Sequence, residues 1–280
     1  MSPTADRDAA SVQLPQVLAS GAARFQRPIL LLFGWWWLMG LGIQIGGVKL
    51  PTSWRWTDAA FLSLGAVSAL VGLWRHVPFQ NVVGASLMIG GLAVAVEAIG
   101  VRTGIPFGRF QYTDALGTRW FGTVPWAISS AWILVLLTCR GVAKVLLRRW
   151  RLTPDYGFWL LGVTSVLATG FDLVLEPYAF HDRAYWIWDP SYLESGWYGV
   201  PWTNSLGWFL SATLLQFAVF PWFVNKKPVD PPQDKSPILL WVLLHVFFLV
   251  PNLQQERWAA VALGVVFVLG LIGFRRSTAA

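Results

Sequence analysis

Eight apolar stretches, each close to the length of a membrane-crossing helix, constrain the fold of this 280-residue chain more than any other feature. A helix needs about 20 mostly apolar residues to cross the hydrocarbon core of a bilayer. The stretches cover roughly residues 28–46, 57–74, 81–101, 125–147, 157–175, 204–224, 237–251 and 258–274. Charged residues make up 12% of the chain, whereas soluble domains carry about 25%. The sequence therefore predicts an all-α, polytopic membrane protein of about eight transmembrane helices.

The distribution of basic residues predicts how the chain is oriented. Thirteen Lys and Arg residues of the tails and loops fall on the side of both termini, and seven fall on the other side. By the positive-inside rule, both termini are expected in the cytoplasm, and loops 102–124 and 176–203 on the outer face of the cytoplasmic (inner) membrane. The net charge of +7 comes from residues in short loops, so no nucleic-acid partner is expected.

Composition also predicts the domain organisation. Residues 1–26 are polar and carry no signal-peptide pattern, which predicts a cytoplasmic tail. Residues 27–276 are expected to form a single transmembrane domain. Within it, segment 225–236 is rich in Pro, Lys and Asp and is expected to be a connector.

The third and fifth stretches begin two related units. Glu97 and Asp172 lie 75 positions apart (172 − 97), and Pro125 and Pro201 lie 76 apart (201 − 125). In each unit a Val-Pro-Trp triplet is followed by a tryptophan seven positions after the proline. Both units start with an outward-running span, so the repeat is parallel and differs from the inverted repeats of many transporters. The aromatic, Gly- and Pro-rich loops are expected to fold back over the helix ends and roof a cavity.

Three carboxylates lie near the outer ends of these spans: Glu97, Asp172 and, one turn beyond it, Glu176. A charged side chain at the centre of a bilayer costs about 2.5–3.5 kcal/mol even on the insertion scale, so a carboxylate there indicates function. Their matched positions predict one shared site. The alternatives are ion pairs of Glu97 with Arg102 and of Asp172 with Arg102 or Arg183, and an interfacial position for Glu176.

Several kinds of chemistry are excluded by what the sequence lacks. Its three histidines, His76, His181 and His245, fall in separate parts of the chain and cannot form the clusters of membrane di-iron enzymes. No G-x-G-x-x-G fingerprint for a dinucleotide is present, nor is a D-D-x-x-D run. Cys139 is the single cysteine and lies in an apolar stretch, so no disulfide or cysteine metal site can form. We therefore expect no metal and no cofactor.

Carboxylates, aromatic rings and amides remain, and this set suits proton chemistry on a hydrocarbon. A carboxylic acid protonates an alkene only in its neutral form, and an unperturbed Asp is neutral in about one part in a thousand at pH 7. An apolar cavity and a second nearby carboxylate both favour the neutral form. Desolvated aromatic faces then stabilise a carbocation by about 2 kcal/mol or more per ring.

The two units resemble the membrane carotenoid-biosynthesis family that contains the carotenoid hydratases, of the γ-carotene hydratase and bisanhydrobacterioruberin hydratase type. The resemblance covers about residues 28–274. Matching residues are Glu97, Gly100, Thr103 to Gly108 and Tyr112 in the first unit, and Asp172, Glu176, Pro177, Trp186, Trp188, Tyr198 to Pro201, Asn204, Gly207 and Trp208 in the second. The sequence departs at Phe110, where tyrosine is expected, and at Ser205, where phenylalanine is expected.

The resemblance implies that water is added across the terminal double bond of an acyclic carotenoid end group, which gives a tertiary alcohol without oxygen or a cofactor. Residues 27–276 are then the catalytic domain of a cofactor-independent hydro-lyase. We expect Asp172 to be the acid, and Glu97 or Glu176 to hold the second proton site and polarise the water. The expected substrate-binding residues are Phe107, Tyr112, Trp186, Trp188, Tyr198, Trp202 and Asn204.

The expected substrate is an acyclic or monocyclic carotenoid dissolved in membrane lipid, such as lycopene, γ-carotene or a C50 relative. One alternative is a carotenoid end-group cyclase or isomerase, which shares the first protonation but excludes water. Another is a proton-coupled transporter or a carotenoid-binding membrane protein. For Trp186 and Trp188, the alternative to a site role is an aromatic belt at the membrane interface.

Overall fold

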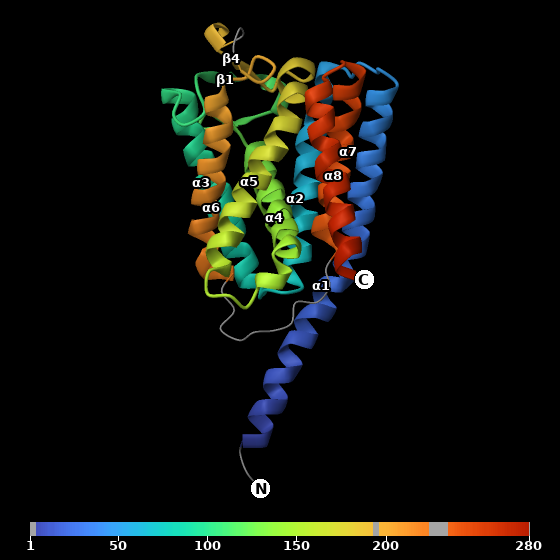
Figure 1. The fold of residues 1–280 in the computed structure, drawn as a ribbon, viewed down its shortest axis with the longest axis vertical. Coiled ribbons are helices and arrows are strands. Elements are labelled where there is room, and N and C mark those ends of the chain that lie inside the picture. Colours follow the sequence, from blue (N-terminus) through green and yellow to red (C-terminus); the bar gives the residue numbers. More distant parts are fainter. Residues whose placement is uncertain (1–3, 193–195, 224–234, 280) are drawn as a thin grey trace.

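The structure is a computed structural model that describes residues 4–192, 196–223 and 235–279. Helices dominate this part of the chain (Figure 1). They are α1 (Thr4–Ile45), α2 (Trp56–Trp74), α3 (Phe79–Thr103), α4 (Ala127–Leu146), α5 (Tyr156–Pro177), α6 (Trp202–Phe223), α7 (Ser236–Gln254) and α8 (Trp258–Ala279). Within the described residues, seven are long and apolar enough to cross a membrane, and α8 has a shorter apolar part, Trp258–Phe274. The prediction of an all-α, polytopic membrane protein is confirmed.

Two helices extend beyond the apolar stretches predicted from the sequence. The first apolar stretch does not begin a new helix at residue 28, because α1 already starts at Thr4 and extends away from the bundle (Figure 1). The seventh helix does not end at Pro251 but continues to Gln254. Proline removes one helical hydrogen bond, and the last turn is held instead by the buried Asn252, whose Nδ2 donates to the Val174 carbonyl over 2.8 Å. The connector predicted at 225–236 lies almost wholly outside the described residues.

The helices form two groups that meet at α4 and α5. The repeat helices α3, α4, α5 and α6 pack on one another, while α1, α2, α7 and α8 cover the far side of α4 and α5. Every residue from Trp132 to Cys139 in α4 is buried. A helix that is apolar on all sides is stable only in the interior, so α4 is the central helix of the bundle.

Two short strands join the repeat units at one end of the bundle, here called the loop end. Strand β1 (Phe110–Tyr112) pairs antiparallel with β4 (Trp186–Trp188), with Phe110 opposite Trp188 and Tyr112 opposite Trp186. Side chains alternate along a strand, so these four rings are buried while Gln111 and Ile187 at the centre are exposed. The predicted roof therefore exists, and the β1–β4 ribbon builds it.

The ribbon lies at the junction between the two units. Gln111 and Ile187 pair with each other and are 76 positions apart (187 − 111), the same spacing as Pro125 and Pro201. Equivalent residues of the two units thus meet at the ribbon's centre. Pro125 lies in the short strand β3 (Val124–Pro125), which pairs with β2 (Arg119–Trp120), and Pro201 directly precedes α6, so both prolines lie just before a helix.

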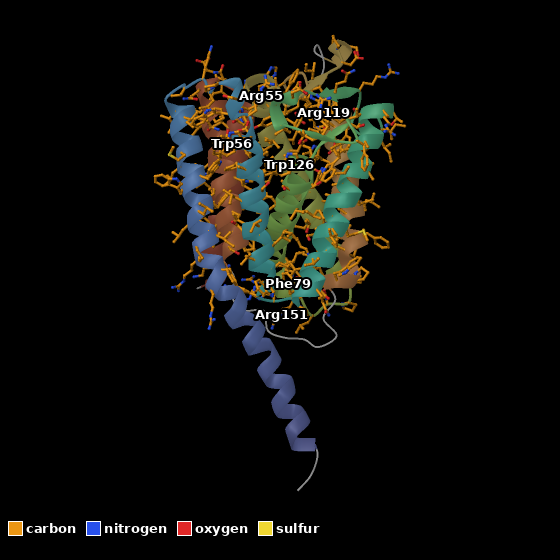
Figure 2. The ribbon with its side chains drawn as sticks, turned by 180° about the vertical axis from the view of Figure 1, so that it is seen from behind. Arg55, Trp56, Phe79, Arg119, Trp126 and Arg151 are labelled. Atoms are coloured by element: carbon orange, nitrogen blue, oxygen red, sulfur yellow. The ribbon has the colours of Figure 1, made fainter. Side chains whose placement is uncertain are left out.

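Aromatic and basic side chains gather at both ends of the bundle (Figure 2). The residues labelled there are Arg55, Trp56, Arg119 and Trp126 at the loop end, and Phe79 and Arg151 at the opposite end. Trp56, Phe79 and Trp126 are all exposed. This arrangement is typical of the two interfaces of a membrane.

Candidate active site

A cavity of about 300 Å³ lies inside the loop end of the bundle, beneath the β1–β4 ribbon. Its walls are mostly aromatic and aliphatic side chains from α1, α2 and α4 to α7. Besides the ion pair of Asp58 and Arg183 described below, its lining includes two carboxylic side chains, Glu97 of α3 and Glu176 of α5, and the amide of Asn204 from α6. We call the region around these three residues the carboxyl end of the cavity. A concave, mostly apolar pocket with a few convergent polar groups is the usual form of a small-molecule site.

Glu97 is buried and accepts two hydrogen bonds. Tyr112 Oη donates to its Oε2 and Trp132 Nε1 donates to its Oε1, each over 2.9 Å. Burial raises the pKa of Tyr112 well above its ordinary value of 10.0, and the charge of Glu97 adds a smaller increase. The phenol therefore keeps its proton and acts as a donor to the carboxylate. Glu97 is held between the ribbon and the central helix, and it does not pair with the exposed Arg102.

Asp172 and Glu176 are linked through a single amide. Asn204 Nδ2 donates to Asp172 Oδ2 and to Glu176 Oε1, both over 2.9 Å. The Trp186 indole Nε1 donates to the other oxygen of Glu176 over 3.1 Å. Asp172 and Glu176 are four residues apart on α5, so their side chains lie on neighbouring positions of one helix face. The two carboxyl groups therefore form one unit with Asn204.

Neither unit is neutralised by a basic residue. Among the residues that the structure describes, no ion pair involves Glu97, Asp172 or Glu176. Arg183, the predicted alternative partner of Asp172, pairs instead with Asp58 of α2. Buried carboxyl groups without a cation are costly to ionise, and such groups cluster at functional sites.

The structure brings most of the predicted residues together. Those that line the cavity are Glu97, Phe107, Tyr112, Glu176, Trp186, Trp188 and Asn204. Phe107 fits against two glycines of the matched units, since a Cβ on Gly100 or Gly207 would come within 2.7 or 2.4 Å of its ring. The Trp188 indole nitrogen is buried.

Three predicted residues lie elsewhere. Asp172 is fully buried but does not line the cavity, and it reaches the cavity only through Asn204 and Glu176. Trp202 is 58% exposed, because it lies two positions, or about 200° around a helix, from the inward-facing Asn204. Tyr198 accepts a hydrogen bond from the Ala259 backbone and does not line the cavity. Substrate binding by Tyr198 and Trp202 stays a prediction, and the cavity described here does not include either residue.

The sequence reasoning missed Trp132 and Trp208 as site residues. Their rings stack with centroids 4.5 Å apart, and both line the cavity. Each follows the proline of its unit by seven positions. That shared spacing was the available signal for a site role.

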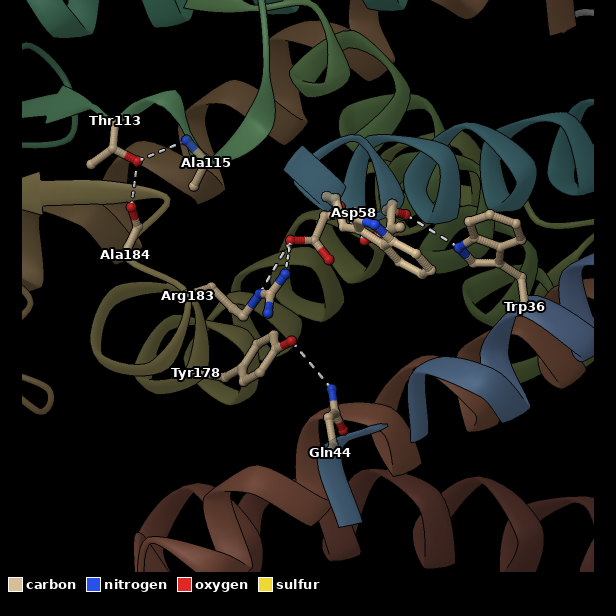
Figure 3. Close-up of polar contacts among 10 residues, drawn as sticks. Trp36, Gln44, Asp58, Thr113, Ala115, Tyr178, Arg183 and Ala184 are labelled. Atoms are coloured by element: carbon tan, nitrogen blue, oxygen red, sulfur yellow. Dashed lines mark hydrogen bonds and ion pairs between the residues drawn. The ribbon is translucent and has the colours of Figure 1, made fainter. Parts of the chain in front are cut away.

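A second polar group, which includes Asp58 and Arg183, lies on the cavity wall, and Figure 3 shows its contacts. Arg183 Nε donates to Asp58 Oδ2 over 3.1 Å, and Nη2 contacts the same oxygen. Nearby, Gln44 Nε2 donates to Tyr178 Oη over 3.2 Å. Asp58 and Arg183 also line an outer pocket of about 500 Å³, together with exposed residues such as Arg55. The ion pair therefore stands between the cavity and the surface.

These features define a membrane protein with a carboxyl-lined cavity beneath an aromatic roof. The family model described as carotenoid biosynthesis protein matches residues 57–271. The chain belongs to this family, which confirms the resemblance seen in the sequence.

A relative with a hydratase name is also similar to the chain. The bisanhydrobacterioruberin hydratase of Haloarcula japonica is 29% identical over 184 residues, which are 63% of this chain. The match spans 58% of that relative, less than two thirds of its length. No solved structure matches the chain.

Proposed function

We propose that the protein is a carotenoid hydratase that adds water across the terminal double bond of an acyclic end group. One observation carries this proposal: Glu97 and Glu176 both line a mostly apolar cavity, and within the described part of the chain neither of them pairs with a basic residue. The name of the Haloarcula japonica relative supports it. The substrates would be lycopene, γ-carotene or a C50 relative, taken from the lipid of the inner membrane, with both termini in the cytoplasm.

The acid is assigned by contact with the cavity. Asp172 was the first choice from the sequence, but Glu176 is the member of the pair that lines the cavity. Two carboxylates this close in apolar surroundings resist joint ionisation, so the pair retains a proton, as in other carboxyl dyads. Glu176 would deliver this proton, and Asp172 would hold the second proton site through Asn204.

The reaction then proceeds through a carbocation. Glu176 protonates the terminal alkene, the π electrons form the new C–H bond, and the positive charge falls on the tertiary carbon. Water adds to that carbon and loses a proton, which balances the one consumed, so no oxidant or cofactor takes part. Glu97, held by Tyr112 and Trp132, would orient this water and accept its proton. Transfer of that proton from Glu97 back to the Asp172–Glu176 pair would restore the acid for the next turnover.

Aromatic faces stabilise the cation between these two steps. Trp132, Trp208 and Phe107 line the cavity at its carboxyl end. A desolvated cation over an aromatic ring gains about 2 kcal/mol or more, and electrostatic stabilisation of developing charge is usually the largest catalytic contribution. Water would enter from the outer pocket past Asp58 and Arg183, the polar section of the wall.

The test uses purified protein in detergent, without oxygen, after treatment with a chelator and with no redox cofactor added. The product should gain the mass of one water molecule, and its oxygen should come from isotope-labelled water. An end-group cyclase or isomerase would give a product of unchanged mass. Oxygen drawn from molecular oxygen would contradict the proposal.

A further inference from the structure

A long polyene cannot fit inside the cavity. Pockets that enclose drug-sized ligands measure about 300–1,000 Å³, and this one has about 300 Å³. If the protein acts on a carotenoid, as proposed above, the end group must occupy the cavity while the rest of the chain leaves through an opening.

One face of α1 both lines the cavity and is open to the outside. The lining residues of α1 include Trp35, Met39 and Ile43, whose spacing of four places them on one helix face. Trp35 is 62% exposed and Met39 is 51% exposed. A residue that lines an interior cavity and is half exposed marks a place where that cavity reaches the surface of the bundle.

The facing side of this opening comes from the start of α2 and from the short turn of helix (Thr52–Trp54) just before it. Trp54 and Trp56 also line the cavity, and both are at least half exposed. Trp36 spans the two sides, because its indole N–H donates to the Thr57 carbonyl over 3.2 Å (Figure 3) and its ring lies 5.6 Å from that of Trp56.

The other side of α1 is fastened. Trp37 Nε1 donates to the Leu243 carbonyl of α7 over 2.7 Å, and a Cβ on Gly40 would come within 2.9 Å of the Phe247 ring. Farther from the loop end α1 also packs on α2, where the rings of Phe33 and Phe61 lie 5.3 Å apart, so the opening is confined to the start of α2.

We propose that the gap rimmed by Trp35, Met39, Trp54 and Trp56, here called the lateral portal, admits the polyene from the membrane and holds its chain during the reaction. The end group lies at Glu97 and Glu176, and the chain runs between α1 and α2 into the lipid. The portal is apolar and exposed, so a hydrocarbon passes through it without crossing water.

The test compares two neighbouring exposed positions of α1. Leu38 is 58% exposed and does not line the cavity, whereas Met39 does. Met39→Lys places a charge in the path of the chain, Leu38→Lys places the same charge beside it, and Met39→Trp narrows the path without a charge. Each variant is assayed with a C40 polyene and with a short acyclic isoprenoid hydrocarbon that carries the same end group and fits inside the cavity.

Both Met39 variants should lower kcat/KM for the polyene by about tenfold or more and should leave the short substrate within about twofold. Met39→Lys acts because a charge facing hydrocarbon is costly, and Met39→Trp acts because the larger ring obstructs the path of the chain. Leu38→Lys should change neither. Equal losses for both substrates, or no loss for the polyene, would overturn the portal. If the unaltered protein hydrates neither hydrocarbon, the proposed function fails. The portal is then tested by polyene binding alone. The Met39 variants must weaken this binding, and Leu38→Lys must leave it unchanged.

Discussion

Tyr112 and Trp186 face each other across the β1–β4 ribbon with ring centroids 6.1 Å apart, and each donates a hydrogen bond to a different carboxyl group of the cavity. Tyr112 holds Glu97 and Trp186 holds Glu176. One cross-strand pair therefore positions the two groups proposed to exchange protons with substrate and water. The ribbon is part of the site as well as its cover.

Tyr112→Phe should lower kcat by about tenfold to a hundredfold, because a hydrogen bond to a charged group contributes about 1.5–3 kcal/mol. The raised pKa of Tyr112 keeps the phenol neutral up to pH 10, so the variant should lower the plateau of the pH–rate profile without removing a titration step. The control is Gln111→Ala, at the exposed neighbouring position of the strand. A Tyr112→Phe protein with full activity would show that Glu97 needs no donor from the ribbon.

Replacing each of the three carboxyl groups by an amide should lower kcat to a different extent. Glu176→Gln should lower kcat by about 10²–10⁴-fold, the usual contribution of a general acid or base, while substrate binding remains. The loss of kcat in Glu97→Gln should lie in the same range. Asp172→Asn should cost less, because the Asn204 link to Glu176 remains. A larger loss in Asp172→Asn than in Glu176→Gln, measured in equally well folded proteins, would return the role of acid to Asp172.

The ion pair between Asp58 and Arg183 should control water supply. Replacing both residues by leucine makes that section of the wall apolar and avoids leaving one buried charge unpaired. We expect a lower kcat with unchanged polyene binding. The matched control is Arg55→Leu, which alters the outer pocket but not the cavity wall. Equal kcat values in all three proteins would place the water route elsewhere.

Gly207→Ala should destabilise the protein, since the added Cβ would lie 2.4 Å from the Phe107 ring. Overpacking of this kind costs about 1–3 kcal/mol, and a displaced Phe107 should also weaken substrate binding. Gly162→Ala in α5 serves as the comparison, because nothing lies within 4 Å of its Cβ position. Thermal unfolding in detergent should show a lower Tm for Gly207→Ala alone.

The orientation in the membrane can be tested by cysteine labelling in a Cys139→Ser background. Phe121 is 91% exposed at the loop end, and Arg151 lies at the opposite end (Figure 2). An impermeant thiol reagent added to intact cells should label Phe121→Cys and not Arg151→Cys. The reverse result would invert the topology inferred from the basic residues.

Much of the fold was predictable from local sequence. Apolar runs of membrane-spanning length specify helices because backbone groups in lipid must be satisfied within each segment. The carboxyl groups stood out for a related reason, since a charge in such a run is costly. The 76-residue spacing between the two units was also visible in the sequence. The matched positions of the carboxyl groups in the two units predicted one shared site.

Only the tertiary structure determined which side chains of the two repeat units contact one another. Glu176 and Asp172 lie four residues apart on α5, about 40° around the helix, and the packing of α6 sets which of them meets the cavity. Trp202 lies on the outer face of α6, and Trp132 reaches Glu97 from 35 residues away. Helical periodicity identifies residues that share a face, but the direction of that face depends on neighbouring helices that are distant in sequence.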